Sequence, residues 1–303
     1  MATIKKKIIE GQEYYYLEHS FRNSGRVEKK EQYLGKQIPK NLEEIKKKFL
    51  YELYSKKWYA FFDGIKERFI KDQKTMPKSI IEKERESFAI RFTYDTNRIE
   101  GSKLTLRETA GLLQRGVTPK EKPLVDIKEA ESHRKVFYEM LSYKKDLNLQ
   151  IVLFWHKELL GSTKSDISGR IREHQVAISG SKFLPPSPVE VYPLLKNFFG
   201  WYEKNKTKMH PVELAALVHL KTVTIHPFGD GNGRIGRLMM NFVLNKFGFP
   251  MLDIKYEKRS SYYNALERSQ LKNNETIFLN WFFKQYIKEQ KRYLNYSKQK
   301  VEK

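Results

Sequence analysis

A polar, glycine-rich turn separates two apolar stretches in IHPFGDGNGRIGRLMMNFVLNKFG, which spans residues 225–248. Pro211 can open the first stretch as a helix, and the second keeps the apolar spacing of a helix beyond the turn. Glycines at positions 229, 231 and 233 let the backbone approach an anion closely, and free N–H groups converge at a helix N-terminus. The turn is therefore predicted to be a phosphate-binding cradle.

Charged and titratable side chains surround this turn. Arg234 and Arg237 are one helical turn apart, so both can face the cradle and bind phosphate oxygens. Asp230 is a single carboxylate, which suits Mg²⁺ because that ion takes most of its other ligands from phosphates and water. His226 is the only side chain there that accepts a proton near pH 7. Together these residues predict a site that handles phosphate groups.

The sequence from His226 to Arg237 resembles the core motif of the Fic family, HPFx[D/E]GN[G/K]RxxR, and matches it at every specified position. The resemblance extends through an HPxExAAxxH-like helix before the motif and a flap near residues 177–186, and it covers roughly residues 88–285. It implies that His226 is the general base and that Asp230 holds Mg²⁺. It also implies that Asn232 and the glycine amides of 231 and 233 orient the α-phosphate. The phosphate-binding residues implied by the family are Gly231, Asn232, Gly233, Arg234 and Arg237.

The activity implied by this resemblance is transfer of AMP from ATP to a Ser, Thr or Tyr hydroxyl of a protein target, with self-modification included. The reaction would be in-line attack at the α-phosphorus with pyrophosphate leaving. Relatives that act as kinases or phosphocholine transferases usually depart from the motif at Gly231, Gly233 or an arginine, and this chain does not. AMP transfer with ATP and Mg²⁺ is therefore the leading prediction. A Fic-fold transferase that uses another nucleotide is an alternative.

An inhibitory segment is predicted at residues 96–101, where TNRIEG matches the family pattern [S/T]xxxE[G/N]. The resemblance implies that Glu100 pairs with Arg237 and competes with the γ-phosphate, while Thr96 and Gly101 complete the pattern. In some relatives the same glutamate positions a water that removes AMP again, and this activity stays open here. From the residues alone, Glu100 could equally be a solvated residue near a helix end.

Two further sets of candidates rest on the resemblance. The flap would align the target by strand addition, and the alternative is an ordinary surface hairpin. Its candidate contacts are Ile178, Lys182 and Phe183. The adenine pocket would follow the core motif, and the alternative there is aromatic core packing. Its candidates are Tyr262, Tyr263 and Asn264. His219 is expected to be a core histidine rather than a metal ligand, because no third ligand appears at metal spacing.

The surrounding elements must position these residues. Residues 13–35 predict a small hairpin or meander around Asn23-Ser24-Gly25, and the pattern becomes helical after Pro39. Residues 169–186 lose helical periodicity and predict a short hairpin or an extended loop. Helix starts are marked by a capping residue followed by an acid three positions later. These pairs are Thr105 with Glu108, Asp126 with Glu129, and Ser187 with Glu190.

The predicted fold is mainly α: a Fic-type helical bundle core with a short β-hairpin flap, plus a small β-rich N-terminal hairpin. The expected organisation is a β-rich extension over 1–38, a helical region over 39–90, a catalytic domain over 91–290 and a basic tail over 291–303. The catalytic domain would contain the inhibitory segment 96–101, the flap at about 177–186 and the core motif 226–237.

The composition of the 303 residues is that of a globular protein, with 40% hydrophobic and 14% aromatic residues. The chain has no cysteine, which excludes disulfides, thiolate zinc sites and a Cys nucleophile. Neither an N-terminal apolar segment nor a stretch of roughly 18 apolar residues is present. We therefore expect a cytoplasmic protein without a membrane partner.

The formal net charge of +22 suits an anionic partner such as nucleic acid, a membrane surface or an acidic protein. Many lysines stand in short runs interleaved with Glu, which favours a solvated surface instead. The second functional hypothesis is a nucleic-acid-associated regulatory protein, based on the charge of the chain and on the Tyr-rich segment 13–35. A toxin inhibited by a partner is less favoured because Glu100 supplies inhibition internally. The sequence does not decide whether the chain forms a homodimer.

Overall fold

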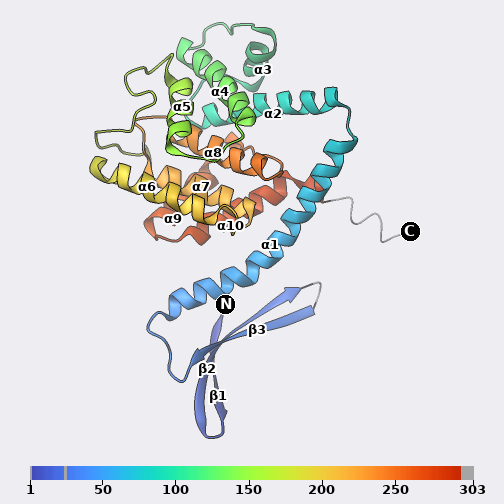
Figure 1. Cartoon of the computed structure of the whole chain (residues 1–303), viewed down its shortest axis with the longest axis vertical. Helices are drawn as coiled ribbons and strands as arrows, with labels where there is room; N and C mark the ends of the chain where they lie inside the picture. Colours follow the sequence, from blue (N-terminus) through green and yellow to red (C-terminus); the bar gives the residue numbers. More distant parts are fainter. Residues whose placement is uncertain (1, 24–25, 295–303) are drawn as a thin grey trace. The chain divides into compact units, whose positions relative to one another are not determined.

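The computed structural model describes residues 2–23 and 26–294, and the chain divides into two units, Met1–Phe61 and Phe62–Lys303. The N-terminal unit contains an antiparallel sheet in the order β1-β2-β3 (Figure 1). Its strands are β1 (Thr3–Ile9), β2 (Gln12–Asn23) and β3 (Arg26–Gly35). The predicted turn at Ser24-Gly25 and residues 295–303 of the predicted basic tail lie outside the described residues.

The sheet is a meander, and its first strand was not predicted. Three consecutive lysines in TIKKKII obscure the alternation of apolar and polar residues that marks a strand. A two-residue turn joins β1 to β2, with φ of 51° at Glu10 and 77° at Gly11. Positive φ at both positions is typical of a type I′ hairpin turn.

The two faces of the sheet differ in character. Leu17 packs with Ala2 and Phe49 in a small buried cluster. On the opposite face, Lys5 pairs with Glu18 at 3.0 Å and Lys7 pairs with Glu31 at 2.5 Å. Three tyrosine rings lie on that face with centroid separations of 5.3 and 6.2 Å: Tyr14, Tyr16 and Tyr33. On this face of the sheet, glutamates therefore balance the charges of these lysines.

The chain beyond the sheet is helical, which confirms the mainly α prediction, and its first helix crosses the boundary between the two units (Figure 1). The helices are α1 (Leu42–Thr75), α2 (Lys78–Ile99), α3 (Leu106–Arg115), α4 (Leu124–Ser142), α5 (Leu149–Leu160), α6 (Pro188–Asn205), α7 (Pro211–Ile225), α8 (Asn232–Lys246), α9 (Arg259–Leu271) and α10 (Glu275–Glu289), with the short 3₁₀ turns η1 (Tyr256–Lys258) and η2 (Lys291–Tyr293). In the described part of the chain, none of these helices has both the length and the apolar character needed to cross a bilayer.

Helices α7 and α8 form the centre of the helical unit. Residues 212–220 of α7 and 234–244 of α8 are buried without interruption, as expected for helices surrounded by other elements. The two helices approach closely at Gly236, where a Cβ atom would lie 2.9 Å from Nδ1 of His219. This packing fixes the two ends of the turn that carries the predicted phosphate cradle.

The helix starts agree with the predicted caps at two of three places. Thr105 and Glu108 form a capping box at the start of α3, and Ser187 and Glu190 form one at α6. Asp126 does not cap α4. That helix already begins after Pro123, whose fixed φ suits a helix start, and the Asp126 carboxylate instead accepts the N–H of Lys103 at 2.6 Å.

The segment between α5 and α6 is an extended loop and contains no strand in its described residues, so the predicted β-hairpin flap is not formed. Hydrogen bonds from side chains, instead of a ladder of backbone hydrogen bonds, hold the two sides of this loop together. Arg172 donates to the carbonyl oxygen of Pro186 at 2.6 Å, and Gln175 donates to that of Pro185 at 3.1 Å. The two prolines have no N–H to donate, so they cannot contribute to a ladder.

Candidate active site

The turn between α7 and α8 is defined by two residues in the left-handed conformation. His226 caps the C-terminus of α7 with φ of 51° and ψ of 59°, and Gly231 precedes α8 with φ of 79°. A Cβ atom on Gly231 would also lie 3.2 Å from Leu160, so glycine suits both the conformation and the space. The predicted position of the turn, at the N-terminus of a helix with free N–H groups, is confirmed.

Asn232 and His156 hold the turn in shape. The side chain of Asn232 accepts the N–H of Phe228 at 2.9 Å and donates to its carbonyl oxygen at 2.8 Å. The Phe228 ring stacks on His156 with centroids 3.9 Å apart. Nδ1 of His156 accepts the N–H of Gly169 at 2.9 Å, so Nε2 carries the proton and donates to the carbonyl oxygen of Asp230 at 3.0 Å. The predicted contact of Asn232 with the α-phosphate stays a prediction.

The imidazole of His226 is anchored on one side only. Its Nδ1 donates to the carbonyl oxygen of Val223 at 3.2 Å, and Nε2 has no hydrogen-bond partner among the described residues. Burial lowers the pKa of His226, and the nearby Arg172 guanidinium lowers it further, against an opposing effect of the Val223 hydrogen bond. The ring is therefore neutral at pH 7 with a lone pair available on Nε2, which is the state that a general base requires.

Arg172 fixes the backbone at His226. Its side chain is 4% exposed, and Nε donates to the carbonyl oxygen of His226 at 2.7 Å. The other guanidinium nitrogens donate to the carbonyl oxygens of His174 at 3.0 Å and Pro186 at 2.6 Å. A planar fork of donors suits such a set of acceptors. Sequence reasoning missed Arg172, because its partners are backbone carbonyls that leave no mark in residue types or spacing.

Arg237 is buried, with 1% of its side chain exposed, and is bound by residues at the C-terminal end of α2 and its cap. Its Nη2 donates to Oε1 of Glu100 at 2.6 Å, and its Nε donates to Oγ1 of Thr96 at 2.6 Å. Burial alone would lower the pKa of Arg237, but the Tyr262 hydroxyl and the Glu100 carboxylate raise it above its ordinary value. The ion pair that the resemblance implied is present. Its inhibitory role stays a prediction.

The carboxylate of Glu100 lies against the first turn of α8. A Cβ atom on Gly233 would overlap Oε1 of Glu100 and would lie 3.1 Å from Nη1 of Arg237. Gly101 follows the end of α2 with φ of 105°, a conformation that favours glycine. The Glu100 carboxylate therefore occupies the space beside both Arg237 and the first turn of α8.

Asp230 and Arg234 belong to a network of alternating charges with two residues that the sequence did not single out for the site. Arg234, which is 2% exposed, pairs with Glu129 and lies 3.5 Å from Oδ1 of Asp230. Lys164 pairs with Oδ2 of Asp230 and lies 3.6 Å from Glu129. Burial raises the pKa of Asp230, but Arg234 and Lys164 bring it below its ordinary value. Asp230 is therefore ionised at neutral pH.

The donor set around Asp230 fits Mg²⁺ as a single-carboxylate site, whose remaining ligands would be phosphate oxygens or water. The described residues contain no cluster of three or more His, Cys, Asp or Glu side chains that could hold a metal. Asp230 offers one carboxylate, and its Oδ2 already binds a cation, the ammonium of Lys164. Mg²⁺ commonly takes one or two carboxylates and completes its shell with phosphate oxygens and water.

The predicted adenine-pocket residues are only partly accessible. Tyr262 is 1% exposed, and its hydroxyl contacts Nε2 of His219 at 2.8 Å and Nη1 of Arg237 at 3.3 Å. Tyr262 thus supports Arg237 and presents no ring face to a base, which departs from the prediction. Tyr263 is 43% exposed, and Asn264 is also exposed, so their assignment stays a prediction. His219 is a fully buried core histidine, as expected.

The tip of the flap is tied to α9 by Glu267. Oε1 of Glu267 accepts the N–H of Lys182 at 2.5 Å and the hydroxyl of Ser181 at 3.1 Å. The N–H of Phe183 donates to Oγ of Ser181 at 3.2 Å. Lys182 is exposed, whereas Ile178 and Phe183 are half-buried. Strand addition would have to displace these side-chain bonds, and the target-docking role stays a prediction.

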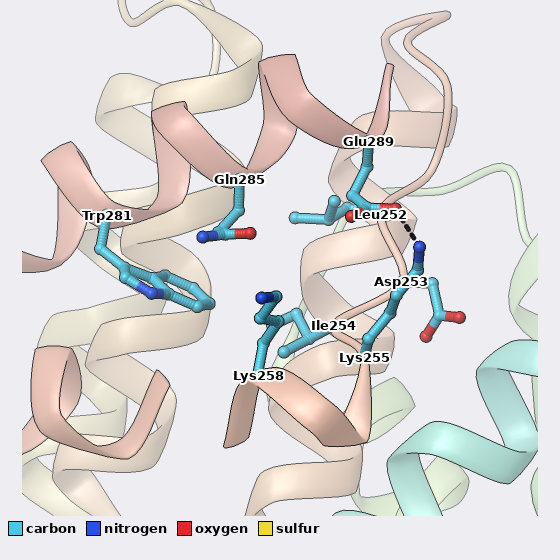
Figure 2. Close-up of a pocket in the computed structure, with 8 residues that line it drawn as sticks. All are labelled: Leu252, Asp253, Ile254, Lys255, Lys258, Trp281, Gln285 and Glu289. Atoms are coloured by element: carbon cyan, nitrogen blue, oxygen red, sulfur yellow. Dashed lines mark ion pairs between the residues drawn. The ribbon is translucent and has the colours of Figure 1, made fainter. Parts of the chain in front are cut away.

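Two cavities lie outside the predicted site. Figure 2 shows one of about 10 Å³ between the segment after α8 and α10, with the ion pair of Lys255 and Glu289 at 2.8 Å beside it. That volume holds about one water molecule. The second cavity, of about 330 Å³, is lined by residues of α6 and α7, the end of α9, the connection from α9 to α10 and the first residue of α10. No predicted site residue lines either cavity, so neither is assigned to the nucleotide.

Comparison with known proteins agrees with this geometry. Residues 146–244 match the model of the Fic/DOC family. The chain is 34% identical over 184 residues to the protein adenylyltransferase Fic of Drosophila ananassae, covering 57% of this chain and 35% of the relative. It is 32% identical over 181 residues to the protein of the same name from Nematostella vectensis, covering 58% of this chain and 42% of the relative. The matched region thus spans less than half the length of these curated relatives.

Solved structures show the same fold. A Fic-domain-containing signaling protein from Bacteroides thetaiotaomicron has a TM-score of 0.70 and 26% identity, covering 78% of this chain and 97% of that chain. A Fic-1 structure from Caenorhabditis elegans has a TM-score of 0.70 and 25% identity, covering 86% of this chain and 79% of that chain. Both similarities extend well beyond the residues that match the family model.

Proposed function

We propose that the chain contains a Fic domain and is a protein adenylyltransferase, which transfers AMP from ATP to a Ser, Thr or Tyr hydroxyl of a protein. The match of residues 146–244 to the Fic/DOC family and the curated relatives named protein adenylyltransferase support this proposal. One observation carries the proposal. The neutral imidazole of His226 is anchored through Nδ1 and leaves Nε2 available, and its turn leads directly into the N-terminus of α8. A base beside an anion-binding helix N-terminus suits attack by a hydroxyl on a phosphoanhydride.

In the proposed reaction, the target hydroxyl oxygen attacks the α-phosphorus of ATP. The bond from that phosphorus to the oxygen bridging to the β-phosphate breaks, and pyrophosphate leaves. Nε2 of His226 accepts the hydroxyl proton. The negative charge of Asp230 favours the imidazolium that forms, because it raises the pKa of His226. The bond from Nδ1 to Val223 keeps the ring oriented while its charge changes.

The phosphates would be bound along α8. The free N–H groups at Gly231 to Gly233 would bind the α-phosphate, and the guanidinium groups of Arg234 and Arg237 would bind the β- and γ-phosphates. Mg²⁺ would be held by Asp230 and phosphate oxygens, and it would neutralise charge on the leaving pyrophosphate. Productive binding of ATP then requires Arg237 to exchange the Glu100 carboxylate for a phosphate. Glu100 is therefore proposed to be the inhibitory residue.

The position of the transferred label tests the reaction class. Purified Glu100→Gly protein is incubated with Mg²⁺ and ATP labelled at the α- or the γ-phosphate, and the protein-bound label is measured. We expect label from α-labelled ATP only, because the bond beyond the α-phosphorus breaks. Label from the γ-position alone would identify a kinase. Stronger labelling from another α-labelled nucleoside triphosphate would identify a transferase for that nucleotide.

The pH dependence of transfer tests the assignment of His226. The reaction needs the unprotonated ring, and burial lowers its pKa below the ordinary value of 6.5. The rate of self-modification by Glu100→Gly should therefore be nearly constant from pH 7 to 8 and should fall on acidification with a midpoint below 6.5. Initial rates with α-labelled ATP measure this profile. A midpoint above pH 7 would contradict the assignment.

A further inference from the structure

Lys164 contacts the carboxylate that we assign to Mg²⁺. Its Nζ pairs with Oδ2 of Asp230 and lies 3.6 Å from Oε1 of Glu129. The backbone of Lys164 is fixed, because its N–H donates to the carbonyl oxygen of Leu160 at 2.7 Å and its carbonyl oxygen accepts the N–H of Ser168 at 3.1 Å. The ammonium therefore reaches Asp230 from a defined turn after α5.

The two carboxylate oxygens of Asp230 are not equivalent. Oδ1 accepts the N–H of Gly231 at 2.5 Å and lies 3.5 Å from Nη2 of Arg234. Oδ2 is bound by Lys164. Mg²⁺ binds a carboxylate oxygen at about 2.0–2.1 Å, and at such a distance it would strongly repel an ammonium on the same oxygen. Because Oδ1 already accepts a backbone N–H, Oδ2 is the oxygen on which a metal would compete with Lys164.

We propose that Lys164 is a built-in competitor of the divalent cation for Asp230, and that the metal binds when the ammonium moves from Asp230 to Glu129. This inference rests on the proposed function, in which Asp230 holds the metal. It describes a second control that is separate from Glu100. Glu100 occupies an arginine that binds phosphate, whereas Lys164 occupies the oxygen that binds metal.

Glu129 can receive the displaced ammonium. Its Oε2 pairs with Arg234, and its Oε1 accepts the hydroxyl of Thr163 at 3.3 Å, which leaves a further acceptor position on Oε1. The Lys164 side chain is 38% exposed and has a flexible stem, so a shift across 3.6 Å is within its reach. Because Lys164 has a carboxylate partner in both positions, the exchange leaves no buried charge unpaired.

The test is binding of Mn²⁺ alone to the full-length, nucleotide-free protein, followed by electron paramagnetic resonance. Mn²⁺ prefers the same oxygen ligands as Mg²⁺. Lys164→Met removes the charge but keeps an unbranched side chain, and we expect the Kd of the Asp230-dependent site to fall about tenfold. Lys164→Arg keeps a cation and should bind Mn²⁺ as wild type does. Lys196→Met removes an exposed cation on α6 and should leave the Kd unchanged.

An unchanged or higher Kd in Lys164→Met overturns the proposal, and so does a gain in affinity that survives Asp230→Asn. Thermal melting of each variant shows that the comparison is made between folded proteins. The measurement involves neither ATP nor transfer, so it is independent of the catalytic test. Tighter Mn²⁺ binding by Lys164→Met in a protein that transfers no AMP would support the competition and refute the proposed function.

Discussion

Glu100→Gly is expected to raise labelling of the protein by α-labelled ATP at least about tenfold over wild type. The Glu100 carboxylate accepts a bond from Nη2 of Arg237 at 2.6 Å, and hydrogen bonds to charged groups contribute about 1.5–3 kcal/mol. Removal of a competitor of that strength corresponds to about 10- to 150-fold tighter binding of ATP. Calorimetry in a His226→Ala background measures the ATP Kd without turnover.

This substitution should leave the rest of the site in place. Glu100 caps the C-terminus of α2 with φ of −85° and ψ of 3°, so glycine there interrupts no helix. Arg237 keeps its bonds from Nε to Oγ1 of Thr96 and from Nη1 to the hydroxyl of Tyr262. The guanidinium therefore stays positioned for a phosphate after its carboxylate partner is removed.

A matched control separates the ion pair from a general effect of charge. Glu121 is an exposed loop residue with φ of 55°, a conformation that glycine adopts readily. Glu121→Gly removes the same charge and introduces the same residue, and it should change neither labelling nor the ATP Kd. Equal labelling by wild type and Glu100→Gly would show that the pair of Glu100 and Arg237 is not inhibitory.

The turn at 226–231 could be predicted from the sequence because its determinants are local. His226 and Gly231 both need a left-handed backbone, and they bracket a short segment between two apolar helices. Residue types and spacing within about twenty positions are enough to recognise such an arrangement. The pair of Glu100 and Arg237 joins residues 137 positions apart, and the residues alone left it undecided. Only family resemblance indicated it.

The sequence did not indicate the side chains that support the turn, because these side chains contact it from distant positions in the chain. His156 is 74 positions from Asp230, and Arg172 is 54 positions from His226. Lys164 pairs with Asp230 across 66 positions. A single histidine, arginine or lysine at such separations has no characteristic spacing, and each would pass for a surface residue or a helix-end residue. Their roles follow only from the packing of α5 and its following loop near the turn.

The flap shows the reverse case. Its local sequence pattern predicted a β-hairpin, but the structure has an extended loop there. Gly180 and the following extended segment are typical of a hairpin, but the strand that would return ends in Pro185 and Pro186. Without N–H groups at those positions a ladder cannot continue, and a two-stranded hairpin alone is only marginally stable. The side chains of Arg172 and Gln175 bind the proline carbonyl oxygens instead.

His226→Gly in the Glu100→Gly background is expected to slow AMP transfer by about 10²–10⁴-fold, the usual contribution of a general base. Glycine adopts the φ of 51° at this position without strain, and the carbonyl oxygen of residue 226 remains available to Arg172. The ATP Kd should therefore stay unchanged, because Arg234 and Arg237 are not disturbed. Initial rates and calorimetry measure the two quantities separately.

Added imidazole distinguishes a missing base from a damaged site. Glycine at 226 leaves the volume of the ring empty, and free imidazole can enter it and accept the hydroxyl proton, so the rate should recover with imidazole concentration.

His174→Gly is the matched control, because His174 is an exposed histidine of the neighbouring loop. That variant should transfer AMP at the rate of its Glu100→Gly parent and should not respond to imidazole. A His226→Gly protein that keeps most of its rate without imidazole would place the base elsewhere. Recovery of the rate would assign the proton transfer to this ring position, since imidazole replaces only the side chain.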